Sequence, residues 1–207
     1  MILYVDRFAP NVRRVLMFID EKGINVPVIE LNIESGEHRS PRMLELNPLG
    51  QLPILELDDG GGLSESTAIC RYLEELHPEP ALFGENPTER ALVEMWLRRV
   101  ELGLFTPAVE YGHHTQPFFH DRFVQIAAWA ALCRDRVAAC CSLLERTLAT
   151  SSYVAGDRFT VADVTAYCGI EIAILWGIGG YGDLGALTAW RGRIGARPSA
   201  AAARYLE

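Results

Sequence analysis

The segment that decides the fold is residues 47–74, NPLGQLPILELDDGGGLSESTAICRYLE. The runs LPILEL and GGLS flank an Asp-Asp-Gly-Gly-Gly turn, whose residues tolerate positive φ, so the pattern predicts a β-hairpin. An amphipathic helix follows, starting on the small polar residues at 64–66. It stops at His77-Pro78, because proline lacks an amide hydrogen and restricts the residue before it. The segment predicts two antiparallel strands followed by a helix.

Upstream, the spacing predicts a β-α-β unit. Residues 2–5 form a short apolar run typical of a buried strand, and residues 26–33, VPVIELNI, predict a second strand. Between them the apolar residues recur at helical spacing up to Gly23, which ends that helix: Val12, Val15, Leu16 and Ile19. With a short helix near residues 42–46, the predicted order of the first half is β-α-β-α-β-β-α.

Downstream, strand signals fade and the second half is predicted to be all-α. Helices are expected around residues 87–110, 121–149, 161–176 and 186–196. Two starts carry capping signals, Asn86-Pro87-Thr88-Glu89 and Thr160 with Asp163. The proline-rich stretch between the halves gives predicted domains at residues 1–80 and 86–207.

Composition limits the partners of the protein. The 207 residues carry a formal net charge of −8, which disfavours binding to nucleic acid or anionic lipid. No segment approaches the roughly 20 apolar residues of a membrane span, and the N-terminus lacks a basic leader, so a cytoplasmic location is expected. Five cysteines lack metal-ligand spacing, and Cys133, Cys140 and Cys141 are expected to be core residues.

The motifs N-P-x-G-x-[LIV]-P and x-E-S-x-A-I-x-x-Y-L in residues 47–74, together with GDRFTVADV at 156–164, are specific in combination. With this element order, the whole chain resembles the cytosolic glutathione transferase family. The resemblance implies an α/β thioredoxin-like N-terminal domain that binds glutathione and an all-α C-terminal domain. It also implies a cis bond between Leu52 and Pro53, which leaves the backbone of Leu52 open to pair with the cysteinyl residue of glutathione.

The resemblance implies that Glu65 and Ser66 hold the γ-glutamyl group. A helix N-terminus attracts a carboxylate, so Ser66 is expected to bind the α-carboxylate and Glu65 the ammonium. The structural alternative is that Ser66 is only an N-cap and Glu65 only complements the helix dipole. For the glycine carboxylate His38 is expected, with Arg39 second and a solvated loop as the alternative; Gln51 either assists or only supports the turn.

The thiol site departs from the family pattern. Classes of the family place Ser, Tyr or Cys beside the thiol, yet Phe8 and Ala9 stand where a hydroxyl usually falls. Asn11 follows Pro10 as in the bacterial Nu class and in relatives of a yeast prion protein, so Asn11 is expected to donate to the thiolate, with Arg13 or Arg14 adding positive potential. The alternatives are that Asn11 caps the first helix or that Tyr4 contacts the thiol.

The second substrate is expected to be a small hydrophobic electrophile bound beside an aromatic segment of the second half. Its candidate residues are Tyr111, His114 and Phe118, with His113 and Phe119 nearby and Trp176 more typical of core. No metal is expected, because adjacent histidines point in different directions on a helix. The resemblance also implies a homodimer.

Three functions remain open at this stage. The leading prediction is conjugation of glutathione, as co-substrate and without a further cofactor, to an electrophile. The alternatives are a Nu-like disulfide-bond reductase or peroxidase that uses glutathione, and a regulatory protein that binds glutathione without catalysis.

Overall fold

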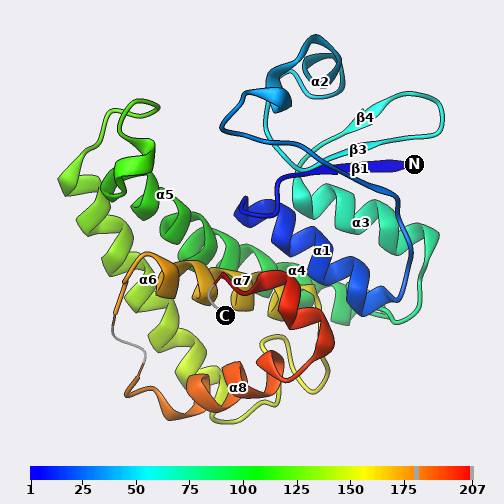
Figure 1. Cartoon of the computed structure of the whole chain (residues 1–207). Coiled ribbons are helices and arrows are strands. Elements are labelled where there is room, and N and C mark those ends of the chain that lie inside the picture. Colours follow the sequence, from blue (N-terminus) through cyan, green and yellow to red (C-terminus); the bar gives the residue numbers. More distant parts are fainter. Residues whose placement is uncertain (180–181, 206–207) are drawn as a thin grey trace. The chain divides into compact units, whose positions relative to one another are not determined.

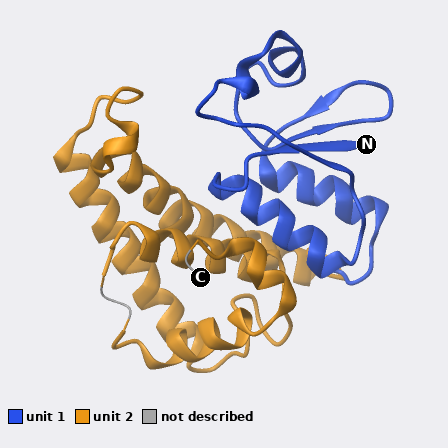
Figure 2. Ribbon diagram, viewed as in Figure 1, with its two compact units in different colours: residues 1–81 blue, residues 82–207 orange. Residues whose placement is uncertain are grey.

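The computed structural model describes residues 1–179 and 182–205. It divides the chain into two compact units, residues 1–81 and residues 82–207 (Figure 2). The sequence placed the domain boundary between residues 80 and 86. Residues 206 and 207, the end of the predicted second domain, lie outside the described residues.

Unit 1 has the predicted order of elements. They are β1 (Ile2–Val5), α1 (Pro10–Lys22), β2 (Val28–Glu30), α2 (Pro41–Leu46), β3 (Ile54–Glu56), β4 (Gly62–Leu63) and α3 (Ser66–Leu76). The sheet order is β2-β1-β3-β4, with β2 parallel to β1 and the other pairs antiparallel. Strand β2 is shorter than the predicted 26–33; Pro27, which has no N–H to donate to a ladder, lies just before it.

The core of unit 1 lies between the sheet and two helices. Leu3 and Val5 are fully buried while their neighbours in β1 are half-buried, as strand alternation requires. Helices α1 and α3 lie side by side on one face of the sheet, and α2 lies on the other (Figure 1). Gly62 allows α2 to approach β4 closely, because a Cβ at this position would stand 2.2 Å from the carbonyl oxygen of Leu46 in α2.

Unit 2 is helical in the residues described. Its helices are α4 (Pro87–Val100), α5 (Thr106–Thr115), α6 (Ala127–Leu148), α7 (Val161–Leu175) and α8 (Gly185–Gly195). A π-helical turn, Glu101–Phe105, joins α4 to α5. The single helix predicted over residues 87–110 is therefore two α-helices joined by this turn, and the second ends at Thr115 rather than at residue 110. In the described parts of the chain, no helix is long and apolar enough to span a membrane.

The prediction of a helix from residue 121 is wrong, since α6 begins at Ala127. Gln125 Nε2 donates to the carbonyl oxygens of His113 (3.1 Å) and Gln116 (2.8 Å), and Ile126 is extended. These contacts hold the segment before α6 against the end of α5. The predicted burial of Cys133, Cys140 and Cys141 on α6 is confirmed, and burial raises the pKa of each thiol to about 11 or 12.

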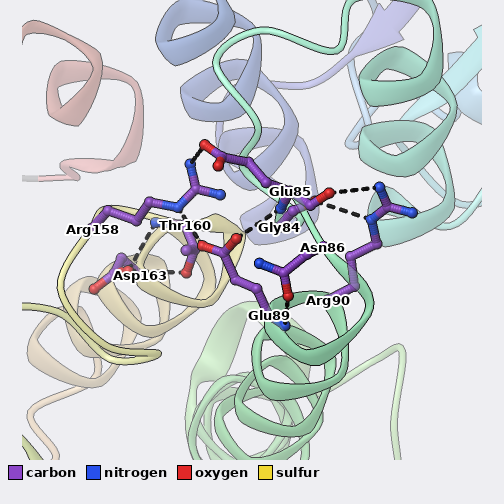
Figure 3. A network of polar contacts seen from close by, with 8 residues as sticks. All are labelled: Gly84, Glu85, Asn86, Glu89, Arg90, Arg158, Thr160 and Asp163. Atoms are coloured by element: carbon purple, nitrogen blue, oxygen red, sulfur yellow. Dashed lines mark hydrogen bonds and ion pairs between the residues drawn. The ribbon is translucent and has the colours of Figure 1, made fainter.

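Helix α7 is buried along its first 13 residues and starts with a closed cap (Figure 3). Asp163 Oδ2 accepts from the backbone N–H of Thr160 (3.0 Å) and from its hydroxyl (3.1 Å), so the predicted capping box is confirmed. The other predicted cap is also present, with Asn86 Oδ1 accepting from the Glu89 N–H at 3.0 Å. Arg158 joins the two starts by ion pairs to Glu85 (2.5 Å) and Glu89.

Candidate functional site

The loop between β1 and α1 is organised by Asp6. Its carboxylate accepts from the N–H of Phe8 (2.9 Å) and of Ile33 (3.0 Å), which fixes the chain as it enters α1. Phe8 is half exposed and Ala9 is the residue before the helix. The entry to α1 therefore presents no hydroxyl at residue 8 or 9.

Asn11 does not cap α1, so that alternative is wrong. Ala9 occupies the N-cap position, Pro10 is the first helical residue, and no side chain caps the end. The Asn11 side-chain oxygen, Oδ1, instead accepts from Arg14 Nη2 at 2.8 Å and from Ser66 Oγ at 3.0 Å. Arg14 Nη2 also donates to Ser66 Oγ at 2.5 Å. Asn11, Arg14 and Ser66 thus form a closed triangle, called here the Asn-Arg-Ser triangle.

The triangle joins α1 to the start of α3. Glu65 holds the N-cap position of α3 with φ 68° and ψ 111°, the only positive φ of a non-glycine residue among the described residues. Such a conformation costs on the order of 1–3 kcal/mol. No side chain caps this helix, so the alternative reading of Ser66 as an N-cap is wrong. The backbone amide of Ser66 and the partial positive charge of this helix end remain available to an anion.

The segment before β3 holds the second feature of the site. The peptide bond between Leu52 and Pro53 is cis, so this prediction is confirmed. Among the described residues, neither the N–H nor the carbonyl of Leu52 forms a hydrogen bond. Asn47 supports the turn: its Nδ2 donates to the carbonyl of Gln51 at 2.8 Å, and its Oδ1 accepts from Leu49 N–H at 3.2 Å. The backbone of Leu52 is therefore held in place but left to pair with something else.

The two candidates for the glycine carboxylate lie on a short 3₁₀ helix, Glu37–Arg39. His38 is half-buried and Arg39 is exposed. The Arg39 side chain lies against Gly50, because a Cβ on that glycine would stand 3.1 Å from its Cγ and 3.5 Å from its Nε. Gly50 precedes Gln51 and Leu52, so Arg39 places a cation beside the turn that carries the open backbone.

Tyr4 is directed elsewhere. Its hydroxyl donates to Glu56 Oε2 at 2.7 Å, and this hydrogen bond, together with burial, raises the pKa of Tyr4. Glu56 also pairs with Arg42 of α2. A tyrosine that donates to a carboxylate and resists ionisation fits a structural link between strands and α2 better than contact with a thiol.

Two phenylalanine rings of unit 2, Phe119 and Phe123, pack against His113, and Phe118 contacts Phe119. The His113 ring stacks on Phe123 at 4.4 Å and meets the edge of Phe119 at 4.6 Å, while burial lowers its pKa. Phe118 is 42% exposed and lies under the guanidinium of Arg122 at 4.4 Å. Phe118 is thus the more accessible ring, whereas His113 is packed.

The remaining histidines of this segment have separate partners. His114 Nδ1 accepts from Ile126 N–H at 3.2 Å, and His120 Nδ1 lies 3.1 Å from Asp121. Trp176 packs on α5, because a Cβ at Gly112 would stand 2.5 Å from its Nε1. Among the described residues, no three side chains of metal-binding type are grouped.

Sequence reasoning missed how two residues act. From the sequence, Arg14 is expected only to add positive potential, and Asn47 only belongs to the N-P-x-G-x-[LIV]-P motif without a role of its own. Nothing in the sequence places the Arg14 guanidinium on Ser66, which lies 52 residues away in the chain. The Asn-Pro before a Gly was a usable signal for Asn47, because asparagine side chains commonly bond backbone groups of a turn.

Comparisons with known proteins agree with this fold. Residues 3–81 match the family model described as glutathione S-transferase, N-terminal domain, and residues 127–202 match that of the C-terminal domain. The chain is 34% identical over 203 residues to glutathione S-transferase 2 of Saccharomyces cerevisiae, covering 96% of this chain and 87% of that protein.

Solved structures agree as well. The crystal structure of Gtt2 from Saccharomyces cerevisiae has a TM-score of 0.91 and 33% identity, covering 98% of this chain and 100% of that one. A glutathione S-transferase domain-containing protein of Marinobacter aquaeolei VT8 has a TM-score of 0.91 and 36% identity, covering 96% and 99%. A class Gtt2 enzyme of Vibrio parahaemolyticus has a TM-score of 0.84 and 34% identity, covering 96% and 94%.

A thioredoxin-like α/β unit with a cis-proline before β3, followed by a helical unit, is the glutathione transferase class of fold. The chain belongs to the glutathione transferase family. Its predicted fold class is confirmed.

Proposed function

We propose that this protein is a glutathione transferase that holds glutathione on unit 1 and activates its thiol through Asn11. The observation that carries the proposal is the uncapped start of α3, where Glu65 is held at positive φ and Ser66 lies beside Asn11. Backbone strain of this kind persists only where the surroundings impose it, and it gathers at binding sites.

The γ-glutamyl group is assigned to this helix start. Ser66 offers its hydroxyl and backbone amide to the α-carboxylate, and the Glu65 carboxylate receives the ammonium. In the structure the Ser66 hydroxyl is directed at Asn11 Oδ1, 3.0 Å away, and it can rotate to a carboxylate that arrives. Charge-assisted hydrogen bonds of this type are about twice as strong as neutral ones.

The cysteinyl residue of glutathione pairs with the backbone of Leu52 in the manner of a strand. The open N–H and carbonyl of this residue support the assignment. Pro53 forms the cis bond that turns the segment, and Gln51 stands before it with its own carbonyl held by Asn47. Both His38 and Arg39 are proposed to bind the glycine carboxylate. The position of the Arg39 side chain against Gly50 supports Arg39 as the main donor to this carboxylate.

Asn11 supplies a hydrogen bond to the thiolate from Nδ2. An ordinary thiol, with a pKa near 8.5, is only about 3% ionised at pH 7, and a fall of two units raises this to roughly three quarters. The two donors on Asn11 Oδ1 support this role, because they leave Nδ2 as its unused donor. The N-terminal dipole of α1 adds to the effect. The thiolate then attacks the electrophile, forming the carbon–sulfur bond as the leaving group departs.

The second substrate is proposed to be a small hydrophobic electrophile that contacts Tyr111, His114 and Phe118. The exposure of Phe118 supports an accessible apolar contact. We further propose a homodimer in the cytoplasm that needs glutathione but no other cofactor. The Pro10-Asn11 pair indicates a likeness to the Nu class, whereas the similarity to the structures of Gtt2 from Saccharomyces cerevisiae and Vibrio parahaemolyticus favours a Gtt2-type enzyme.

Two measurements test this function. Ultraviolet titration of enzyme-bound glutathione is expected to give a thiol pKa below 8 in the wild type and near its free value in Asn11→Ala. Turnover of a chloronitrobenzene exceeding that of hydroxyethyl disulfide or a peroxide supports conjugation. The reverse order indicates a reductase or peroxidase, and binding without turnover indicates a regulatory protein; either result overturns the proposal.

A further inference from the structure

Arg14 is a buried cation in the second turn of α1. The residue is 3% exposed, and its Nη2 bridges two oxygens, Ser66 Oγ at 2.5 Å and Asn11 Oδ1 at 2.8 Å. Those two oxygens are themselves 3.0 Å apart. One guanidinium nitrogen therefore contacts both Ser66, which the proposed function assigns to the carboxylate of the γ-glutamyl residue, and Asn11, which it assigns to the thiol of the cysteinyl residue.

The donors and acceptors of the Asn-Arg-Ser triangle can be assigned without ambiguity. A guanidinium only donates and the oxygen of a carboxamide only accepts, so the Ser66 hydroxyl is the one group that does both. It accepts from Arg14 and donates its single proton to Asn11. If that proton turns to a bound carboxylate, Arg14 is the donor that remains on Asn11 Oδ1.

We infer that Arg14 is a positioning residue that fixes which atom of Asn11 faces the thiol; the inference rests on the proposed function. With Arg14 on Oδ1, the carboxamide keeps its Nδ2 on the opposite side, where it can donate to a thiolate. Without Arg14, a half-turn of the carboxamide exchanges the two atoms and presents a lone pair to the negative sulfur. Arg14 thus keeps the thiol donor in place while Ser66 binds the carboxylate.

The test separates orientation of Asn11 from affinity for glutathione. Arg14→Met removes both hydrogen bonds and leaves an unbranched, uncharged side chain. Arg14→Lys keeps a buried cation, but its ammonium ends one atom short of the Nη2 position that bridges the two oxygens. Arg134→Met on α6 is the matched control, because Arg134 is exposed and its partner is its neighbour Asp135. For each variant, thermal melting checks folding, calorimetry gives the Kd of glutathione, and ultraviolet titration gives the pKa of the bound thiol.

The expected result is a rise of about one unit in the thiol pKa of Arg14→Met, equivalent to about a fivefold lower thiolate fraction near pH 6.5. Arg14→Met combined with Asn11→Ala should show no further rise beyond Asn11→Ala. Ser66→Ala, which keeps the Arg14–Asn11 bond, should weaken binding yet leave the thiol pKa within a few tenths of a unit. Arg134→Met should match the wild type in every readout.

A wild-type thiol pKa in Arg14→Met overturns the inference while the proposed function stands. If Arg14→Met does not fold, Arg14→Lys decides in the same way, since a wild-type thiol pKa in that variant shows that a donor at the position of Arg14 Nη2 is not needed. A depressed thiol pKa that Asn11→Ala leaves unchanged overturns the inference together with the proposed role of Asn11, while glutathione binding to unit 1 stands. A wild type that binds no glutathione, or binds it with an ordinary thiol pKa, overturns the proposed function together with the inference.

Discussion

Two helices of this chain begin in opposite ways. Helix α7 starts inside unit 2 with Thr160 and Asp163, both buried, in a reciprocal cap. Helix α3 starts in unit 1 without a side-chain cap, on Glu65 at positive φ, with the hydroxyl of Ser66 directed away from its own backbone and toward Asn11. The start of α7 is closed by its own side chains; the start of α3, called here the open start, has no side-chain cap.

The difference teaches where the chain puts stability and where it puts binding. A closed cap stabilises a helix by roughly 1 kcal/mol or more, whereas an open start lacks that gain and here adds backbone strain. An open start keeps amides and a positive dipole end for a ligand. We therefore expect changes at α7 to act on folding and changes at α3 to act on glutathione.

The largest effect is expected from Asp163→Ala. Asp163 is fully buried and accepts from Val154 N–H (2.9 Å), Trp190 Nε1 (2.9 Å), and the N–H and hydroxyl of Thr160. Leaving these buried donors without an acceptor should lower the free energy of unfolding by about 3–5 kcal/mol. Urea denaturation measures it, with exposed Asp157→Ala as the control. A loss below about 1 kcal/mol would mean that the cap is dispensable.

A second effect concerns pH. Burial raises the pKa of Asp163 to about 6, against about 3.9 in an unfolded chain. Between these values the folded state binds more protons than the unfolded state, so the free energy of unfolding should fall as pH rises from about 4 to 6 and level off above. The titration of Asp163 should account for about 2–3 kcal/mol of this fall in the free energy of unfolding. Denaturation curves of wild type and Asp163→Asn across this range should differ in slope; parallel curves would refute the assignment.

At the open start, Ser66→Ala should weaken glutathione binding by roughly 10- to 100-fold, because a hydrogen bond to a charged group contributes about 1.5–3 kcal/mol. Its effect on stability should stay near 1 kcal/mol, since Arg14 and Asn11 still bond to each other. Calorimetry gives the affinity and denaturation the stability. Ser64→Ala, two residues earlier, is the matched control, and equal losses of affinity in the two variants would contradict the assignment.

The smallest effect separates two contributions of Glu65: the cost of its backbone conformation at positive φ, and the binding of glutathione by its carboxylate. Glu65→Gly and Glu65→Ala both remove the carboxylate that is proposed to bind the ammonium, so both should weaken glutathione binding. Only glycine adopts positive φ without penalty, so Glu65→Gly should be more stable than Glu65→Ala by about 1 kcal/mol. Thermal melting of the two variants measures the difference. A glycine variant no more stable than the alanine variant would show that the backbone at residue 65 carries no strain.

Much of the fold could be predicted because its signals are local. The capping patterns at Asn86 and Thr160, the stop at Gly23 and the turn at residues 58–62 each depend on neighbours in sequence, and each is present. The predicted start of α6 is six residues too early. The loop before this helix is held by hydrogen bonds from Gln125 to the carbonyl oxygens of Gln116 and His113, which lie 9 and 12 residues earlier in the chain. Periodicity does not report such contacts.

The candidate site divides in the same way. Its residues at 52, 53, 65 and 66 followed from motifs and the family resemblance, and the cis bond at Leu52-Pro53 is present. The role of Arg14 depends on a hydrogen bond to Ser66, which lies 52 residues away in the chain. The positive φ of Glu65 could not be predicted from the residue type, because glutamate rarely adopts such a conformation. Tertiary placement decided both.

The most direct test of the open start is a titration of backbone amide resonances with glutathione. The account predicts that millimolar glutathione shifts the amide signals of Leu52 and Ser66 in a saturable way, while those of Val161 and Asp163, at the closed start of α7, stay unchanged. Saturable binding that leaves Leu52 and Ser66 unmoved, or no binding at all, would contradict it.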